Sequence, residues 1–299
     1  MARIIFFAVL FMMSGVEVYA QSCCATGAVA ACTGSASSLE SFRKNTLGLR
    51  WVRAPFESQL AEEPAFTDKF HLAELFGRYH FNKRLSVSAR LPYRWNVRQT
   101  GNETEVLDGL ADIRLMGHYN LVDSKGKKAR TLLNAALGIK LPTGRYVKDI
   151  GYRDLPGNFN LGTGNYALLL QASLLHQWKN FGLNLSANYQ LNGKSNDDYQ
   201  YGDQTVASAL FFFEKKLGKD LHLMPLAGAT WEHFAVNYKA SGNLAEGSGG
   251  EGLFGQLGLG LKAKDWQLAG TFFLPLAQSY ADDQIKANER ISLELTRFF

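Results

Sequence analysis

The sequence predicts an all-β protein: a transmembrane antiparallel up-and-down β-barrel of about 12 strands, with both termini in the periplasm. Three observations support this fold class. The N-terminus has the layout of a secretory signal, segments of about ten residues alternate between apolar and polar side chains, and the connections alternate between short and long. Together these features are typical of bacterial outer-membrane proteins.

Residues 1–20 are predicted to be a cleaved signal peptide. Arg3 supplies positive charge, residues 4–13 form an apolar run of ten, and residues 18–20 place small side chains at positions −3 and −1 of the cut. A membrane anchor would need about 20 apolar residues, so this run is too short for one. Lipid modification of Cys23 is an alternative, although the residues before it lack the expected leucine.

Residues 21–45 are predicted to form a periplasmic segment that contains all three cysteines, Cys23, Cys24 and Cys32. In an oxidising periplasm Cys32 could form a disulfide with Cys23 or with Cys24, leaving one thiol over. Metal binding by the thiolates is the alternative, but the C-x-x-C spacing is missing and no histidine is near. The pattern therefore favours a disulfide over a metal site.

Residues 46–299 are predicted to form the barrel, because apolar and polar residues alternate there with period two. Residues 85–97 illustrate this, with Leu85, Val87, Leu91 and Tyr93 on one face and charged or polar residues on the other. The same pattern recurs at 183–191 and 253–263. The predicted strands lie near 46–56, 69–81, 85–98, 109–121, 131–141, 166–177, 183–191, 204–217, 221–234, 252–263, 266–276 and 289–299.

The connections between these segments fix the predicted topology. They are tight near 82–84, 179–181, 218–220 and 264–265, intermediate around 123–126, and long at 57–68, 99–108, 142–165, 192–203, 235–251 and 277–288. Short periplasmic turns that alternate with longer external loops are typical of outer-membrane barrels.

Aromatic residues near the strand ends predict two interfacial belts. They are Trp51, Tyr79, Phe81, Tyr93, Trp95, Tyr119, Trp178, Trp231 and Trp266. At the C-terminus Ile291, Leu293, Leu295 and Phe299 share one face, which resembles the signal read by the outer-membrane insertion machinery, and Arg297 departs from that pattern.

Composition excludes some classes of function. The net charge is +5 and is spread along the chain, without the compact Lys/Arg cluster of a nucleic-acid-binding protein. A mean hydropathy of −0.14 leaves no later segment able to span a membrane as a helix, as expected when only every second strand residue faces lipid.

The polar faces of the predicted strands carry nine basic and four acidic side chains that would line the lumen. They are Arg50, Glu74, Arg78, Arg90, Arg94, Arg98, Asp112, Arg114, Lys140, Glu214, Lys262, Arg290 and Glu294. Arg90, Arg94 and Arg98 would stack about 13 Å apart along one strand. This ladder could guide an anionic or polar solute, or Glu74, Asp112 and Glu214 could neutralise it across a partly filled barrel; both interpretations stay open.

Three prolines, Pro92, Pro225 and Pro275, fall inside predicted strands and imply bulges or kinks. These could be rim geometry, or weak points through which an apolar solute leaves the barrel sideways. No catalytic residue, metal site or cofactor is predicted: the six histidines form no H-x-x-x-H pattern, and none is followed two residues later by serine.

Five short motifs resemble those of outer-membrane proteins in the family named for the MetA-pathway of phenol degradation. They are Leu91-Pro92-Tyr93, Gly109-Leu110-Ala111-Asp112-Ile113, Leu141-Pro142-Thr143-Gly144, Leu161-Gly162-Thr163-Gly164-Asn165 and Leu274-Pro275-Leu276-Ala277-Gln278. The resemblance covers roughly residues 46–299. It implies a channel or transporter for small, often aromatic or hydrophobic, compounds and does not fix a substrate.

The leading hypothesis is therefore passive or facilitated diffusion of small molecules across the outer membrane. A structural or surface-interaction barrel with a plugged lumen is the alternative. A membrane-embedded hydrolase is the least favoured, because the sequence shows no pairing of a nucleophile with a base. The expected partners are outer-membrane lipid, the insertion machinery and a small-molecule solute, with no nucleic acid.

Overall fold

The computed structural model describes residues 43–58, 65–126, 128–148, 150, 155–195, 197–245 and 247–299. The predicted signal peptide, Cys23, Cys24 and Cys32 lie outside the described residues. Within the described part no helix is long and apolar enough to cross a membrane.

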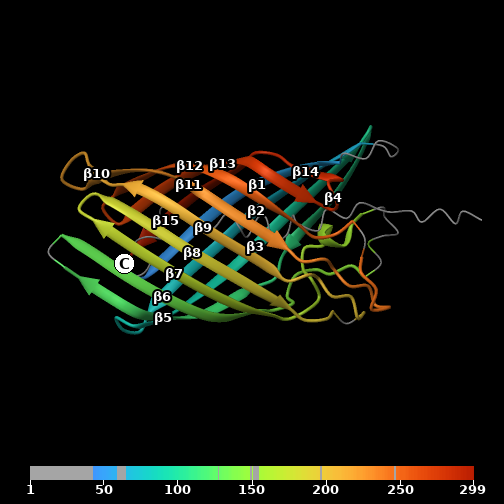
Figure 1. Ribbon diagram of the computed structural model, residues 1–299, viewed down its shortest axis with the longest axis horizontal. Coiled ribbons are helices and arrows are strands. Elements are labelled where there is room, and N and C mark those ends of the chain that lie inside the picture. Colours follow the sequence, from blue (N-terminus) through green and yellow to red (C-terminus); the bar gives the residue numbers. More distant parts are fainter. Residues whose placement is uncertain are drawn as a thin grey trace, which may run out of the picture.

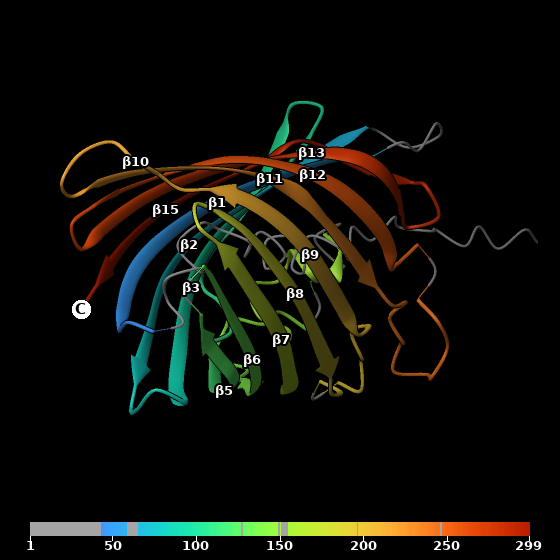
Figure 2. The same ribbon diagram turned by 60° about the vertical axis from the view of Figure 1, so that its left-hand side comes forward.

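Fifteen strands within the described residues form one antiparallel sheet that curves around a common axis (Figures 1 and 2). They are β1 (Thr46–Ser58), β2 (Phe66–His80), β3 (Leu85–Thr100), β4 (Glu103–Leu110), β5 (Arg114–Lys125), β6 (Ala129–Lys140), β7 (Ala167–Trp178), β8 (Phe181–Asn192), β9 (Gln204–Phe213), β10 (Lys215–Lys216), β11 (Leu221–Phe234), β12 (Gly250–Ala263), β13 (Trp266–Tyr280), β14 (Ile285–Ala287) and β15 (Arg290–Phe298).

The sheet is closed, because β15 pairs with both β13 and β1. In three places two successive strands, β4 with β5, β9 with β10 and β14 with β15, occupy one line of the wall. The described strands therefore make twelve lines of wall, and the predicted antiparallel barrel of about 12 strands is confirmed.

The predicted alternation is visible in the exposure of the side chains. On β3 Leu85, Val87, Leu91 and Tyr93 face outward and are exposed, whereas Asn96 on the other face is buried. On β12 Leu257 points outward and is 66 % exposed. Exposed leucines on a closed barrel are stable only when lipid covers them, so the outer surface is that of a membrane protein.

The two ends of the barrel differ in their connections. At the end called here the turn end, two-residue turns join β7 to β8 and β12 to β13, with Lys179 and Lys264 at positive φ. At the opposite end, the loop end, long connections span 141–166, 193–203 and 235–249. Exposed aromatic side chains mark the turn end, as the predicted interfacial belt requires: Tyr79, Phe81, Tyr119, Trp178 and Trp266.

Three predicted connections are wrong. The segment 99–108 is a hairpin in which β3 and β4 pair and Gly101, at φ 57°, makes the turn. The segment 277–288 is also mostly strand, belonging to β13 and β14. The connection around 123–126 is short, because β5 continues to Lys125 past a register shift after Asn120. The ends of these strands extend beyond the apolar belt and carry polar side chains. The alternation of apolar and polar residues therefore did not identify them as strands.

Each of the three strand prolines lies beside a change in a β-ladder, and a register shift of the predicted kind occurs at Pro275. At Pro92 the edge of β3 changes its partner from β5 to β4. Pro275 lies beside the register shift between β12 and β13. Pro225 adjoins the gap between β9 and β10, without a change of register. The interruption at Pro92 positions the site described below.

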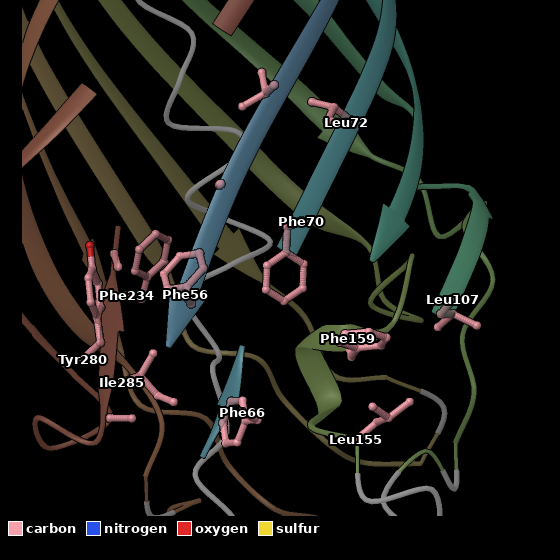
Figure 3. Close-up of a cluster of buried hydrophobic side chains, with 14 of the residues drawn as sticks. Phe56, Phe66, Phe70, Leu72, Leu107, Leu155, Phe159, Phe234, Tyr280 and Ile285 are labelled. Atoms are coloured by element: carbon pink, nitrogen blue, oxygen red, sulfur yellow. The ribbon is translucent and has the colours of Figure 1, made fainter. Parts of the chain in front are cut away.

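Two hydrophobic clusters fill parts of the interior. The loop-end cluster joins Phe56, Phe70 and Leu72 of the wall to Leu155 and Phe159 of the 141–166 connection (Figure 3). A short 3₁₀ turn, η3 (Gly157–Phe159), presents Phe159 to Phe70, with the rings edge to face at 5.8 Å. The turn-end cluster consists of Leu132, Leu175, Leu210, Phe212, Met224, Leu226 and Ala269. The 141–166 connection is therefore anchored inside the loop end.

Candidate functional site

The wall breaks between β4 and β5, and Asp112 lies in this break. The residue is 6 % exposed, and its carboxylate accepts three hydrogen bonds, from the Gly144 amide at 3.0 Å, the Thr163 amide at 2.9 Å and the Thr163 hydroxyl at 3.0 Å. The Thr143 hydroxyl accepts a further bond from the amide of Ile113 at 2.9 Å. The two ends of the 141–166 connection are thus tied to one carboxylate.

Glycine is required where these segments meet. A Cβ on Gly162 would lie 2.6 Å from the Asp112 Oδ1, and a Cβ on Gly144 would lie 2.8 Å from the Gly162 Cα. Gly164 has φ +64°, which side chains other than glycine rarely adopt. Three of the sequence motifs therefore build one junction, rather than three separate turns.

Lys140, at the end of β6, completes the junction. Its side chain is 2 % exposed and its Nζ lies 3.5 Å from Asp112 Oδ2. The same ammonium donates hydrogen bonds to the Thr163 hydroxyl and to Asn165 Oδ1, the latter at 3.0 Å. A buried lysine without such partners would be strongly destabilising, so Asp112 and Lys140 depend on each other.

Between the two hydrophobic clusters lies a polar band of inward-facing charged residues. Within the described residues it has five cations and three carboxylates. They are Arg50, Glu74, Arg90, Arg94, Asp112, Arg114, Lys140 and Glu294. The band is therefore cationic overall.

The cations of the polar band are not spread evenly. Arg90 lies directly opposite Arg114 across the β3–β5 ladder, and Arg114 lies directly opposite Lys140 across the β5–β6 ladder. Like charges in directly opposed positions destabilise a sheet. These three residues, named here the cationic row, stand about 5 Å apart from one to the next.

The carboxylates do not neutralise the row fully. Glu74 forms an ion pair with Arg50 and a longer one with Arg90, at 3.4 Å. Asp112 is shared between Lys140 and the backbone of the 141–166 connection. The guanidinium of Arg114, by contrast, forms neither a hydrogen bond nor an ion pair with any described residue.

The predicted arginine ladder has unequal members. Arg98 is held by Asp68 through two hydrogen bonds of 2.7 Å, and its guanidinium lies 3.9 Å from the centre of the Phe66 ring. Asp68 had no place among the predicted inward residues, because the strand was expected to begin at Lys69. Counting the alternation back from Phe70 would have placed it there. Arg94 is buried beside Asp112, in the lining of a cavity.

Of the other predicted lumen residues, Arg290 is 1 % exposed, forms an ion pair with Glu232 at 2.7 Å and lies against the loop-end cluster, 5.5 Å from the centre of the Phe56 ring. The remaining three lie toward the turn end. Arg78 donates a hydrogen bond to the Ser86 hydroxyl at 2.9 Å. Glu214 pairs with His222 at 2.7 Å, so it does not neutralise the ladder. Lys262 lies 5.6 Å from the centre of the Phe298 ring. These three are not part of the polar band.

Two adjoining cavities meet at Arg114. The first, toward the loop end, is lined by charged residues that include Arg94, Asp112 and Lys140, and its volume of about 30 Å³ leaves room for about two water molecules. The second, toward the turn end, has about 70 Å³, room for about five. Arg114, Gln190 and Gln204 line both cavities.

The structure also brings together a serine and a histidine that are far apart in sequence. Ser88 Oγ and His118 Nε2 are hydrogen-bonded at 2.8 Å, and His118 Nδ1 lies 3.3 Å from Asn134 Oδ1. The sequence showed no such grouping, because Ser88, His118 and Asn134 come from three different strands. Asn134 donates in turn to Asn120 at 2.8 Å.

No group of three or more His, Cys, Asp or Glu residues able to hold a metal ion occurs in the part of the chain that the structure describes.

The sequence pattern of a family described as "Putative MetA-pathway of phenol degradation" matches residues 65–224. No protein of curated function matches the chain significantly.

Solved structures with a similar fold are outer-membrane barrels. An outer-membrane channel from Pseudomonas putida F1 superposes with a TM-score of 0.64 and 16 % identity, over 86 % of this chain and 96 % of the other. The translocator domain of the autotransporter NalP from Neisseria meningitidis has a TM-score of 0.50 and 12 % identity, over 95 % and 100 % of the two chains. At these identities the likeness establishes the fold.

Proposed function

This chain belongs to the family of the MetA-pathway of phenol degradation, and we propose that it is a channel for passive or facilitated diffusion of small molecules across the outer membrane. It is an outer-membrane β-barrel, with lipid around its apolar outer face. The solved channel of similar fold from Pseudomonas putida F1 supports the proposal.

The observation that carries the proposal is the pair of adjoining cavities in the polar band. A barrel of about twelve strands is wider than barrels that side chains fill and narrower than open porins. The two cavities leave water-sized space in its interior, next to side chains that can replace a solute's hydration. We propose that small solutes cross through this space, and that the two hydrophobic clusters let apolar and aromatic molecules enter the path.

The wall break offers a second exit for apolar solutes. Among the described strands β4 pairs with β3 alone, so its other edge meets no strand. The break adjoins Pro92, which cannot donate a ladder hydrogen bond. We propose that an apolar solute leaves the lumen sideways here, past the 141–166 connection.

Ion conduction tests the proposal most simply. Purified protein in a planar bilayer should give discrete conductance steps in potassium chloride, and these should be small because the path is narrow. A barrel that inserts in a folded state and stays silent would contradict the proposal.

A plugged barrel with an interaction role is the second candidate, favoured by the loop-end cluster that anchors the 141–166 connection inside the barrel. The two candidates differ in what removal of residues 142–165 does. If the lumen is plugged, the wild type is silent and the shortened protein conducts. If it is a channel, both conduct, and the shortened protein conducts more.

We propose that the chain is not an enzyme and that Ser88, His118 and Asn134 form a structural network. Their hydrogen bonds satisfy polar groups on an interior where His118 is 6 % exposed. A fluorophosphonate probe that labels activated serines should leave the folded protein unlabelled. Labelling that disappears in Ser88→Ala would establish a hydrolase instead.

The remaining expectations concern assembly. We propose that residues 1–20 are removed, that both termini lie in the periplasm, that Cys32 pairs with Cys23 or Cys24, and that the insertion machinery reads the C-terminal strand. Leu293, Leu295 and Phe299 are exposed there, and Arg297 lies 4.9 Å from the centre of the Phe299 ring, so its charge does not remove the aromatic end. N-terminal sequencing of the mature protein should begin at Gln21.

A further inference from the structure

We infer that the cationic row, Arg90, Arg114 and Lys140, is a selective binding site for small amphipathic anions, meaning apolar molecules that carry one carboxylate or sulfonate. The inference rests on the proposed channel function and names the class of solute that this site favours.

The charges around Arg114 favour a bound anion. Arg114 stands between two other cations that lie directly opposite it in the sheet. Purely structural charges in such positions would each be expected to face a carboxylate, because opposed like charges cost stability. Glu74 is engaged with Arg50 and Arg90, and Asp112 with Lys140 and the 141–166 connection. The third carboxylate of the polar band, Glu294, lies directly opposite Arg50 and not opposite the cationic row. A bound anion would supply the missing negative charge next to Arg114.

Arg114 also lies where a solute would pass. Arg114 lines both of the adjoining cavities, so a solute that moves from the loop-side cavity to the turn-side cavity passes its guanidinium. A guanidinium presents several donors in a planar fork that matches a carboxylate or sulfonate. The two cavities leave room for only a few water molecules, so the guanidinium is weakly screened, which strengthens the attraction.

An apolar surface lies beside the cationic row. On its turn side the second cavity is lined by Met116, Leu169 and Val206 as well as Arg90 and Arg114. Met116 follows Arg114 by two residues on β5 and therefore points to the same face. A solute could thus place its anionic group against the cationic row and its apolar body against these three side chains. A simple inorganic anion would use only half of this lining.

The test compares two probes that share a benzene ring and differ in charge, benzenesulfonate and benzyltrimethylammonium. Both are permanently charged and cross protein-free bilayers slowly. Each is trapped in liposomes that contain the full-length mature protein, and its release is followed by absorbance, with potassium and valinomycin present to balance charge. We expect wild-type protein to release benzenesulfonate faster than benzyltrimethylammonium.

Variants assign the effect to Arg114. Replacement Arg114→Gln should slow benzenesulfonate release about tenfold, the size expected for loss of one charge-assisted contact, and should speed release of the cation. Arg114→Lys keeps the charge and should retain most of the anion preference. Arg53→Gln removes one positive charge from the outward face of β1 and should change neither rate. Heat-modifiable mobility on gels verifies that each variant is folded.

The outcomes separate this inference from the proposed function. If the wild type releases both probes at one rate, or if Arg114→Gln changes both rates equally, the anion site is overturned and the channel stands. If benzyltrimethylammonium leaves faster, the anion site is likewise overturned. If the wild type releases neither probe and conducts no ions, both fail together.

Discussion

The two halves of the barrel wall present different inner surfaces. The stretch of chain from β1 to β6 carries all the charged residues of the polar band except Glu294 of β15, whereas the inner faces of β7 to β9 carry amides and hydroxyls. The neutral residues are Gln171, Ser173, Asn184, Ser186, Asn188, Gln190, Asn192, Gln204 and Ser208. The neutral half satisfies part of its own polarity, as in the hydrogen bonds between Ser186 and Ser208 at 2.7 Å and between Gln190 and Asn192 at 2.9 Å.

The difference shows how each half is stabilised. Amides and hydroxyls can donate and accept, so neighbours on one wall can satisfy each other. Charged side chains cannot satisfy one another in this way when cations outnumber carboxylates. The charged half recruits the 141–166 connection, whose amides bind Asp112, and it leaves Arg114 without a protein partner among the described residues. The charged half therefore holds the 141–166 connection in place and also carries Arg114, the residue proposed to bind a solute.

The largest expected effect comes from removing the anchor. Asp112→Ala would leave Lys140 buried without its carboxylate, a change that typically costs about 3–5 kcal/mol. It would also free the 141–166 connection, so conductance should rise while thermal stability falls. Thermal unfolding in detergent and planar-bilayer recordings measure the two effects.

A matched control is an aspartate at the exposed turn end of β5, in the same line of the wall as Asp112. Asp123, on β5, pairs with Arg43 near the turn end, where both side chains are partly exposed. Asp123→Asn should cost less than about 1 kcal/mol, because exposed ion pairs contribute little. Equal destabilisation by both substitutions would show that Asp112 does not anchor the connection.

The second prediction removes charge from β3. Replacing Arg90, Arg94 and Arg98 together by glutamine should lower the ratio of anion to cation release by about tenfold or more. Stability should fall too, because Asp68 loses its buried partner Arg98. A panel of solute permeabilities that stays unchanged would remove the arginine ladder from the mechanism.

The third prediction concerns the introduction of a charge into the neutral half of the wall. Asn188 lines the same cavity as Arg114, so Asn188→Asp places a carboxylate where the cationic row can reach it. Release of benzenesulfonate should slow about two- to threefold, by competition of the new charge for Arg114. Asn188→Leu, which adds no charge, serves as the control, and an identical effect of both substitutions would indicate a steric cause.

The smallest expected effect concerns the loops above the lumen. Burial alone would raise the pKa of Asp197, but hydrogen bonds from Ser195 and from Tyr146, the latter at 2.9 Å, hold it below its ordinary value of 3.8. Because the folded-state pKa is lowered, this stabilisation is present above about pH 4 and is lost as the pH falls through the lowered pKa. The difference in melting temperature between wild type and Asp197→Asn should therefore shrink at acidic pH, and a constant difference would contradict this.

Local patterns of apolar and polar residues in the sequence predicted most of the fold. Alternation on β3, on β8 and on β12 revealed which face meets lipid, because each side chain's direction follows from its own position in the strand. The polar ends of β3 and β13 were missed because strand ends outside the bilayer need no apolar face. The motifs around Asp112 revealed turns but not that they meet, since contacts between residues 112, 144 and 163 depend on how the chain folds back into the barrel.

The candidate site, too, was only partly predictable from the sequence. Arg90 and Arg114 could be assigned to an inward face from the sequence, whereas their direct opposition depends on the strand register. Arg114 has no partner among the described residues because Glu74 and Asp112 bind other groups. Only the folded structure reveals which groups these are. Ser88 and His118 were likewise invisible as a pair.

Release of uncharged sugars of increasing size from liposomes tests the central claim of a small-molecule channel most directly. Reconstituted wild-type protein should release the smallest sugars well above the rate of protein-free liposomes, and release should fall steeply with size because the cavities beside Arg114 hold only a few water molecules. Release of every sugar at the protein-free rate, by protein shown to be folded and inserted, would contradict the account.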